Sequence, residues 1–373
     1  TLRHSREGRE TGVFTVSTNM NMGEKTQAMT RKIFTLTIVL LLVCLFTVSG
    51  AAAREVVDMV GRKVTLPSVI KKVYAPSPYG SYILYAMDPK LMAGLIFPLK
   101  EEDKRFLDKS VHHLPVIGGL FGQGQTANME VLLKQKPDLI ILWTTGKAAI
   151  NEKAEETLNK LNIPYVYAVA ENLAAYPDVF LFLGKVLGRE ERGKMLARYT
   201  RGVLYNVAAV VDQTPWEKRP SVYYAEGTDG LKTECNDSIH VELIKLAGDR
   251  DVHRCHTASH VGMEKISLEQ VIIYDPDVIV VQEETFYDKV FSDPRWQHVK
   301  AVREKRVYLV PRLPFNWFDR PPSFMRILGL QWLMGCLYPE RYPLDIVREA
   351  RTFYKLFLGV DVPYGEMKAV IRK

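Results

Sequence analysis

The same pattern of residues occurs twice in this chain. Residues 129–142 (MEVLLKQKPDLIIL) and 268–281 (LEQVIIYDPDVIVV) each place a glutamate at the head of a short apolar segment, followed by Pro-Asp and an apolar run. Each copy predicts a short helix that ends near the proline, then a buried strand. The repeat therefore indicates two similar α/β lobes rather than one large domain.

The N-terminal region has the features of an export signal. Arg31 and Lys32 precede an uninterrupted apolar run over residues 33–48, and small residues lead to a predicted cut after Ala53. The run is shorter than the ~20 residues of a membrane span. We expect residues 29–53 to be a cleavable signal peptide, with a retained N-terminal anchor as the alternative. Residues 1–28 are polar and patternless, and we expect them to be upstream or non-native sequence.

Composition and charge exclude several classes of protein. The chain is 47% hydrophobic and 25% charged, which suits a globular protein with real cores. The formal net charge of +7 is mild, part of it lies in the leader, and no basic-aromatic stripe or nucleic-acid motif is present. The sequence therefore argues against a nucleic-acid partner.

Strands alternate with helices in both halves, which predicts βαβ units and mostly parallel sheets. We expect a first lobe at residues 54–174 and a second at 214–373, with a ligand cleft between them. Residues 175–213 repeat apolar side chains at helical spacing, which predicts one long connector helix with a bend near Gly188. A further helix is expected to open at Pro321-Pro322.

Motifs for common enzyme chemistries are incomplete. Residues 122–124 (Gly-Gln-Gly) lack the third glycine of a dinucleotide fingerprint, and residues 145–147 (Thr-Gly-Lys) lack the upstream glycine of a phosphate loop. Neither a nucleophile elbow nor a His-Glu-x-x-His zinc motif occurs. We therefore do not expect an enzyme.

Cysteine and histidine gather between Cys235 and His260. The predicted export permits disulfides, and Cys235 and Cys255 flank one expected helix, so they are candidates for a bridge. The ligand spacings lack the tight pairs of a preformed metal site, and we expect no bound metal. His260 is a separate candidate for a ligand-binding residue, because its loop leads to the second glutamate-headed helix.

Aromatic and basic residues follow the predicted strands. In open α/β sheets, ligands bind beyond the carboxyl ends of the strands. Tyr79, Trp143, Trp317 and Phe318 lie in such positions, and Lys147 and Arg320 add positive charge that would complement an anionic ligand.

Glu130 and Glu269 occupy matching places in the two repeats. Either could simply stabilise its helix through the helix dipole. Their matched position favours a paired role on one face, such as docking to a two-fold symmetric partner that carries arginines.

The export signal, residues 58–67 (DMVGRKVTLP), the two glutamate…Pro-Asp units, the connector and residues 317–320 (WFDR) resemble the periplasmic substrate-binding proteins of ferric-siderophore and vitamin B12 ABC transporters. The resemblance covers residues 54–358. It implies two α/β lobes joined by one long helix, and a monomer without a cofactor. It assigns Glu130 and Glu269 to docking on a permease dimer with its ATPase.

The resemblance also adds cleft residues. By position in the family pattern they are Ser77, Gly80, Gly122, Gln123, Thr144, Glu226 and Gly227. The implied ligand is a metal chelate of the ferric siderophore, haem or cobalamin type. A molybdate or tungstate oxyanion is the alternative within the same class, and an exported metalloenzyme built on residues 235–260 is the alternative of another class.

Overall fold

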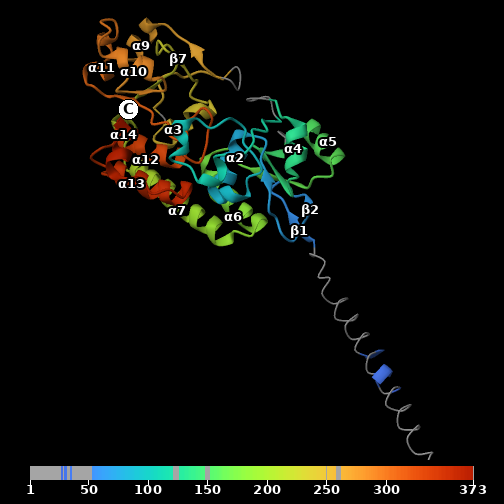
Figure 1. Ribbon diagram of the computed structural model, residues 1–373. Coiled ribbons are helices and arrows are strands. Elements are labelled where there is room, and N and C mark those ends of the chain that lie inside the picture. Colours follow the sequence, from blue (N-terminus) through green and yellow to red (C-terminus); the bar gives the residue numbers. More distant parts are fainter. Residues whose placement is uncertain are drawn as a thin grey trace, which may run out of the picture. The chain divides into compact units, whose positions relative to one another are not determined.

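Two three-stranded parallel sheets organise the chain from Ala53 onward (Figure 1). The computed structural model describes residues 27, 29–31, 34–35, 53–120, 126–147, 152–248, 250–257 and 262–372. Most of the predicted signal peptide, residues 29–53, lies outside them. Among the described residues, no helix combines the length and apolar character needed to cross a bilayer.

The first lobe is built on the sheet β3-β4-β5, whose neighbouring strands are parallel. A small antiparallel hairpin, β1-β2, precedes it. The elements of this lobe are β1 (Arg54–Val57), β2 (Lys63–Leu66), β3 (Val73–Tyr74), α2 (Pro78–Met87), η1 (Pro89–Leu91), α3 (Glu101–Lys104), η2 (Lys109–Val111), α4 (Met129–Gln135), β4 (Leu139–Thr144), α5 (Glu152–Lys160) and β5 (Tyr165–Val169).

The second lobe is built on the parallel sheet β6-β9-β10, again with strands in chain order. Its elements are η5 (Trp216–Lys218), β6 (Val222–Ala225), β7 (Lys232–Thr233), η6 (Ile239–Val241), α8 (Glu242–Leu246), β8 (Glu264–Lys265), α9 (Leu268–Tyr274), β9 (Val278–Val281), α10 (Glu284–Val290), η7 (Trp296–His298), α11 (Lys300–Arg303), β10 (Val307–Leu309), α12 (Arg326–Leu337), α13 (Ile346–Phe353), the π-helical turn η8 (Tyr354–Leu358) and α14 (Tyr364–Arg372).

The sequence repeat forms the centre of each lobe. α4 and α9 end in residues with left-handed backbones, Lys136 and Asp275, and lead into the central strands β4 and β9. The aspartate of each Pro-Asp then accepts hydrogen bonds from the backbone entering the neighbouring strand. Asp138 bonds the Lys72 amide at 2.8 Å, and Asp277 bonds the Ser221 amide at 2.8 Å. Pro-Asp thus ends a helix and fixes strand position in both lobes.

Both central strands are apolar because both of their faces are buried. In β4, Ile140 and Leu142 pack into the first-lobe core, whereas Leu139 and Ile141 face a larger core that both lobes share. In β9 the side chains likewise alternate between the second-lobe core and the shared core. This arrangement explains why neither run shows polar alternation.

The connector region consists of a 3-10 turn, η4 (Leu173–Ala175), and two α-helices, α6 (Tyr176–Leu187) and α7 (Glu190–Asp212). The prediction of a long connector helix is confirmed by α7, whereas the bend predicted near Gly188 is a break between α6 and α7. Gly188 takes a left-handed backbone (φ 65°) that ends α6, and α6 packs along α7. An ion pair of 2.8 Å joins Arg201 to Asp178 across the two helices. The long connector is α7.

Close packing of α6 on α7 depends on Gly193. A Cβ atom at this position would overlap the Phe180 carbonyl oxygen, whereas a Cβ at Gly202 of the same helix would have nothing within 4 Å. We expect Gly193→Ala to lower the free energy of unfolding by about 2 kcal/mol through overpacking. Gly202→Ala should raise it by about 1 kcal/mol through helix propensity. Denaturant unfolding of the two variants measures the difference, and equal effects would contradict the proposed contact.

Candidate functional site

Loops at the carboxyl ends of the strands form the candidate site. On the first lobe, Ser77 follows β3 and caps α2 by accepting a hydrogen bond from the Gly80 amide at 3.2 Å. This cap places Tyr79 in the first turn of α2, where its ring stacks on Trp143 at 5.8 Å between centroids. Trp143 in turn meets the edge of Tyr176 at the start of α6. Three aromatic side chains thus form one wall.

Tyr79 faces charged groups of the second lobe. Burial, and then the Asp319 carboxylate, raise the pKa of Tyr79 to about 12, while Arg326 and Arg320 act in the opposite direction. Tyr79 therefore stays a neutral hydrogen-bonding phenol at physiological pH.

Five ionisable residues of the second lobe form what we call the charge cluster, and these are Glu226, Glu234, His240, Asp319 and Arg320. Arg320 pairs with both Glu226 and Glu234, and its Nε lies 3.8 Å from Asp319. The three carboxylate side chains are at most 1% exposed, whereas Arg320 is 18% exposed. Arg320 is therefore the member of this ion-pair set that reaches the surface of the cleft.

The cluster is fixed from several directions. Ser238 Oγ donates to Glu234 at 2.8 Å, and the Met263 amide donates to the same carboxylate at 2.8 Å. His240 Nδ1 bonds Asp319; burial lowers the pKa of His240, but this carboxylate outweighs it and the net shift is upward. Arg320 holds a left-handed backbone (φ 57°) that residues other than glycine seldom adopt. The charged side chains are thus held before any ligand arrives.

Burial, opposed by Arg320 and assisted by Glu234, raises the pKa of Glu226 to about 7. The folded state holds this proton more tightly than the unfolded state does. The Glu226 proton therefore makes its full contribution to the free energy of unfolding below pH ~4.5, and this contribution is lost as the pH rises to ~7.

Glu226→Gln should make the free energy of unfolding less dependent on pH, because it removes a pH-dependent loss of up to roughly 3 kcal/mol. Thermal unfolding from pH 4 to 8 tests this. The exposed control Glu284→Gln should follow the wild-type curve, and a Glu226→Gln curve parallel to wild type would contradict the assignment.

Beside the charge cluster lies a cavity of about 350 Å³ that both lobes line. Its walls are mainly apolar and aromatic, with Tyr82, Tyr85, Leu95, Phe97 and Phe315 among them. Arg320, Gln282 and Asn316 supply polar groups. A space of this size and lining suits an organic ligand rather than a bare ion.

The structure separates the predicted site residues into groups. Ser77, Tyr79, Gly80 and Trp143 come together on the first lobe, and Glu226 and Arg320 come together on the second. Thr144 is buried and bonds Gly146 within its own turn, while Gly227 (φ 76°) provides the turn after Glu226. Lys147 is exposed and lies beside Gly61 of the β1–β2 turn. Gly122, Gln123 and His260 lie outside the described residues.

Trp317 and Phe318 do not present a surface to a ligand. Both are fully buried, Trp317 bonding the Tyr354 hydroxyl at 3.3 Å and Phe318 stacking on Tyr224 at 4.8 Å. α12 also presses on this loop, since a Cβ at Gly329 would overlap the Trp317 carbonyl oxygen. Their geometry is that of core residues that hold Asp319 and Arg320 in place. The helix expected at Pro321-Pro322 begins only at Arg326, so residues 321–325 extend the site loop.

The sequence of the second half of the first lobe and most of the second lobe matches a known protein family. A family model described as "Periplasmic binding protein" matches residues 110–313, which is more than half of the chain. The chain belongs to this family. It is therefore an extracytoplasmic solute-binding protein of the kind that serves ABC importers.

Relatives of this periplasmic binding protein differ in their named ligands. An ABC transporter solute-binding protein of Sulfurospirillum deleyianum is 41% identical, with a TM-score of 0.79 over 86% of this chain and 99% of that one. The molybdate-binding protein MolA of Haemophilus influenzae is 23% identical over 85% of this chain and 95% of its own length. The Fe(3+)-citrate-binding protein YfmC of Bacillus subtilis is 24% identical over 56% and 63% respectively.

The two repeated glutamates of this periplasmic binding protein are exposed in the first turns of α4 and α9. Asn128 and Ser267 cap these helices by accepting from the Val131 amide at 3.1 Å and the Gln270 amide at 3.2 Å. Hydrogen bonds from its own amide and from Ser267 lower the pKa of Glu269, so it carries its charge at neutral pH. The structure thus presents one glutamate on an equivalent helix of each lobe.

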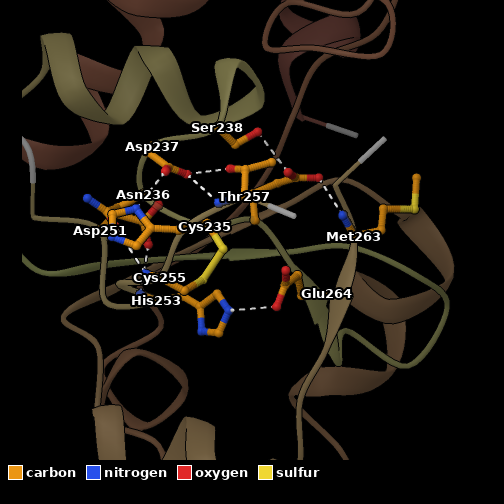
Figure 2. Close-up of a disulfide and its surroundings, with 12 residues drawn as sticks. Cys235, Asn236, Asp237, Ser238, Asp251, His253, Cys255, Thr257, Met263 and Glu264 are labelled. Carbon is orange, nitrogen blue, oxygen red and sulfur yellow. Dashed lines mark hydrogen bonds and ion pairs between the residues drawn. A yellow bond between two sulfur atoms is a disulfide. The ribbon is translucent and has the colours of Figure 1, made fainter. Parts of the chain in front are cut away.

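Cys235 and Cys255 are joined in a disulfide (Figure 2). Cys336 is a free cysteine. The bridge closes the segment that contains η6 and α8. Cys235 directly follows Glu234, so the bridge lies next to the charge cluster.

Sequence reasoning missed two members of the charge cluster as cleft residues, namely Glu234 and His240, whereas Asp319 lies within residues 317–320, which were among those that carried the family resemblance. Both lie far along the chain from Asp319 and Arg320, and no sequence motif joins the two segments. The signal that could have been used was Asp319 beside Arg320, because a buried arginine requires nearby carboxylates.

Proposed function

We propose that this binding protein captures a metal chelate with an organic ligand, of the ferric siderophore, haem or cobalamin type, and delivers it to an ABC importer. The observation that carries the proposal is the cavity of about 350 Å³ with apolar and aromatic walls beside Arg320. The organic part of a chelate would fill this space, and Arg320, Gln282 and Asn316 would orient it. Tyr79 and Trp143 offer a further aromatic surface nearby.

Charge pairing in the cavity supports a chelate over a bare oxyanion. Each cationic side chain that lines the cavity has a carboxylate partner, and the pairs are Lys100 with Glu102, Arg312 with Glu283, and Arg320 with Glu226 and Glu234. A dianion in this cavity would meet only cations that already have carboxylate partners, and it would face buried carboxylates. A chelate that contains a metal cation and polar oxygens is electrostatically compatible with such a site.

Molybdate or tungstate is the second candidate. It is favoured by the similarity to MolA, which extends over nearly the whole of that protein. An oxyanion would have to draw Arg320 away from its glutamates or use the His240 and Arg320 donors together.

Calorimetric titration separates the two ligand classes. The mature chain is purified, unfolded and refolded before the titration. It is then titrated with ferric citrate, a ferric hydroxamate, a ferric catecholate, haemin, cobalamin, molybdate and tungstate, and sulfate is the control anion. We expect tight binding of one chelate and no heat from the oxyanions. Tight molybdate or tungstate binding without chelate binding would overturn the proposal.

A cavity-filling variant gives an independent result. Leu95 lines the cavity and is 8% exposed, so Leu95→Trp should weaken chelate binding at least 10-fold by occupying the space. Leu181→Trp on the exposed side of α6 is the matched control and should bind normally. Unaltered affinity in Leu95→Trp would place the ligand elsewhere.

A further inference from the structure

Four side chains around the disulfide are arranged as metal ligands. Ligand atoms of Cys235, His253, Cys255 and Glu264 all lie within 4.8 Å of one another. Figure 2 shows His253 and Glu264 directed toward each other beside the two sulfurs. We call these four residues the tetrad. Two sulfurs, one imidazole nitrogen and one carboxylate oxygen form a donor set suited to Zn²⁺.

His253 is the observation that points to a ligand. The residue is 9% exposed, and its buried Nε2 makes no hydrogen bond within the described part of the chain. This atom lies 3.9 Å from the Glu264 carboxylate. The other ring nitrogen, Nδ1, lies 3.0 Å from the Tyr274 hydroxyl. When Nδ1 carries the proton and donates it to Tyr274, Nε2 presents a lone pair to the tetrad, which is the usual arrangement of a metal-binding histidine.

The backbone around the tetrad is held without the disulfide. The Asn236 amide donates to the His253 carbonyl at 2.9 Å, and the Cys255 amide donates to the Asn236 side chain at 3.2 Å. Glu264 is held opposite Thr233 by the antiparallel pairing of β7 with β8. The Cα atoms of the two cysteines are 5.0 Å apart. After reduction, two thiolates at this spacing can separate to the ~3.8 Å that tetrahedral Zn–S bonds of about 2.3 Å require.

We infer that reduction of the Cys235–Cys255 bridge converts the tetrad into a binding site for a zinc-class divalent cation. A dithiol reductant transfers two electrons and two protons to the disulfide, is itself oxidised to a disulfide, and leaves two protein thiols. The cation then displaces one proton from each thiol and is held by both thiolates, His253 Nε2 and the Glu264 carboxylate. The bridged and metal-bound forms exclude each other because they use the same sulfurs.

The full mature chain tests this inference. It is reduced with a trialkylphosphine, which becomes the phosphine oxide and leaves no competing thiol, and is titrated with Zn²⁺. We expect one Zn²⁺ per reduced chain with the release of two protons, and no such binding by the oxidised chain. Co²⁺ should give thiolate charge-transfer absorption and the visible bands of a tetrahedral site. Equal Zn²⁺ binding by both forms, or none by the reduced form, overturns the inference.

Variants identify the ligands. His253→Ala and Glu264→Ala should each weaken Zn²⁺ binding by the reduced chain at least 10-fold, since each removes one ligand. His256→Ala is the matched control because its side chain is exposed and contacts Asp237 instead. Unchanged affinity in His253→Ala would remove the tetrad as the site. If reduction alone unfolds the chain, recovery of the native circular dichroism spectrum on adding Zn²⁺ supports the site, and failure to recover it refutes the site.

Discussion

Arg320→Ala is expected to lower the free energy of unfolding by about 3–5 kcal/mol and to abolish ligand binding. Arg320 is the cation that compensates the buried carboxylates of Glu226 and Glu234. Its removal leaves these groups facing each other in a site that water scarcely reaches. One or both must then take up a proton or draw water into the cleft, and either response costs free energy.

The size of this effect follows from burial. Surface ion pairs usually contribute about 0–1 kcal/mol, but breaking a buried pair by removing one partner strands a charge. Arg312→Ala is the matched control on the same loop. Arg312 is 45% exposed and lies 3.9 Å from Glu283, so its loss should change stability by less than about 1 kcal/mol. Arg320→Lys should fall between the two variants because one ammonium group cannot reproduce the forked contacts.

Urea unfolding at pH 7 and at pH 5 measures the effect. The destabilisation of Arg320→Ala should be smaller at pH 5, because a carboxylate that can take up a proton there no longer needs the cation. A change under 1 kcal/mol at pH 7, or an equal loss in Arg312→Ala, would show that the charge cluster is not electrostatically organised around Arg320.

The repeated pattern predicted the centre of each lobe because its information is local. A Pro-Asp pair ends a helix wherever it stands, and an apolar run between turns reads as a buried strand. The cap that Asn128 provides for α4 is a local feature of the same kind, because asparagine is a favoured N-cap residue. The sequence around Gly188 does not distinguish a bend from a break. Apolar residues recur at helical spacing on both sides of it, whether the chain continues straight or folds back.

The site was harder to predict because it depends on contacts between distant segments. Trp317 and Phe318 follow a strand, as ligand-binding aromatics do, yet α12 and η8 cover the loop and bury both rings. Conversely, Glu234 and His240 look like ordinary polar residues in the sequence. They become part of the charge cluster only because the loop after β10 carries Asp319 and Arg320 to them.

A double variant, Glu130→Ala with Glu269→Ala, is expected to bind ligand with unchanged affinity and to lose ligand uptake. Both side chains are exposed on helices α4 and α9 and are absent from the cavity lining, so the cleft should be unaffected. We propose that each glutamate pairs with an arginine on one of two related permease subunits. Desolvated charge pairs at an interface typically cost about 2–5 kcal/mol when one partner is truncated, and loss of two such pairs would prevent productive docking.

Single variants and a matched pair distinguish docking from a general loss of charge. Glu130→Ala and Glu269→Ala should each reduce uptake partly, because one lobe still docks. Glu190 and Glu284 are also exposed glutamates in the first turns of helices, α7 and α10, so Glu190→Ala with Glu284→Ala removes the same charge from the first turns of two other helices. Uptake is measured in cells that carry the complete importer, with the chelate identified by calorimetry.

Normal uptake by the Glu130–Glu269 double variant, or equal loss in the control pair, would show that docking does not depend on the repeated glutamates. Loss of uptake confined to the first pair would assign the most conspicuous feature of the sequence to the membrane-facing surface of the protein.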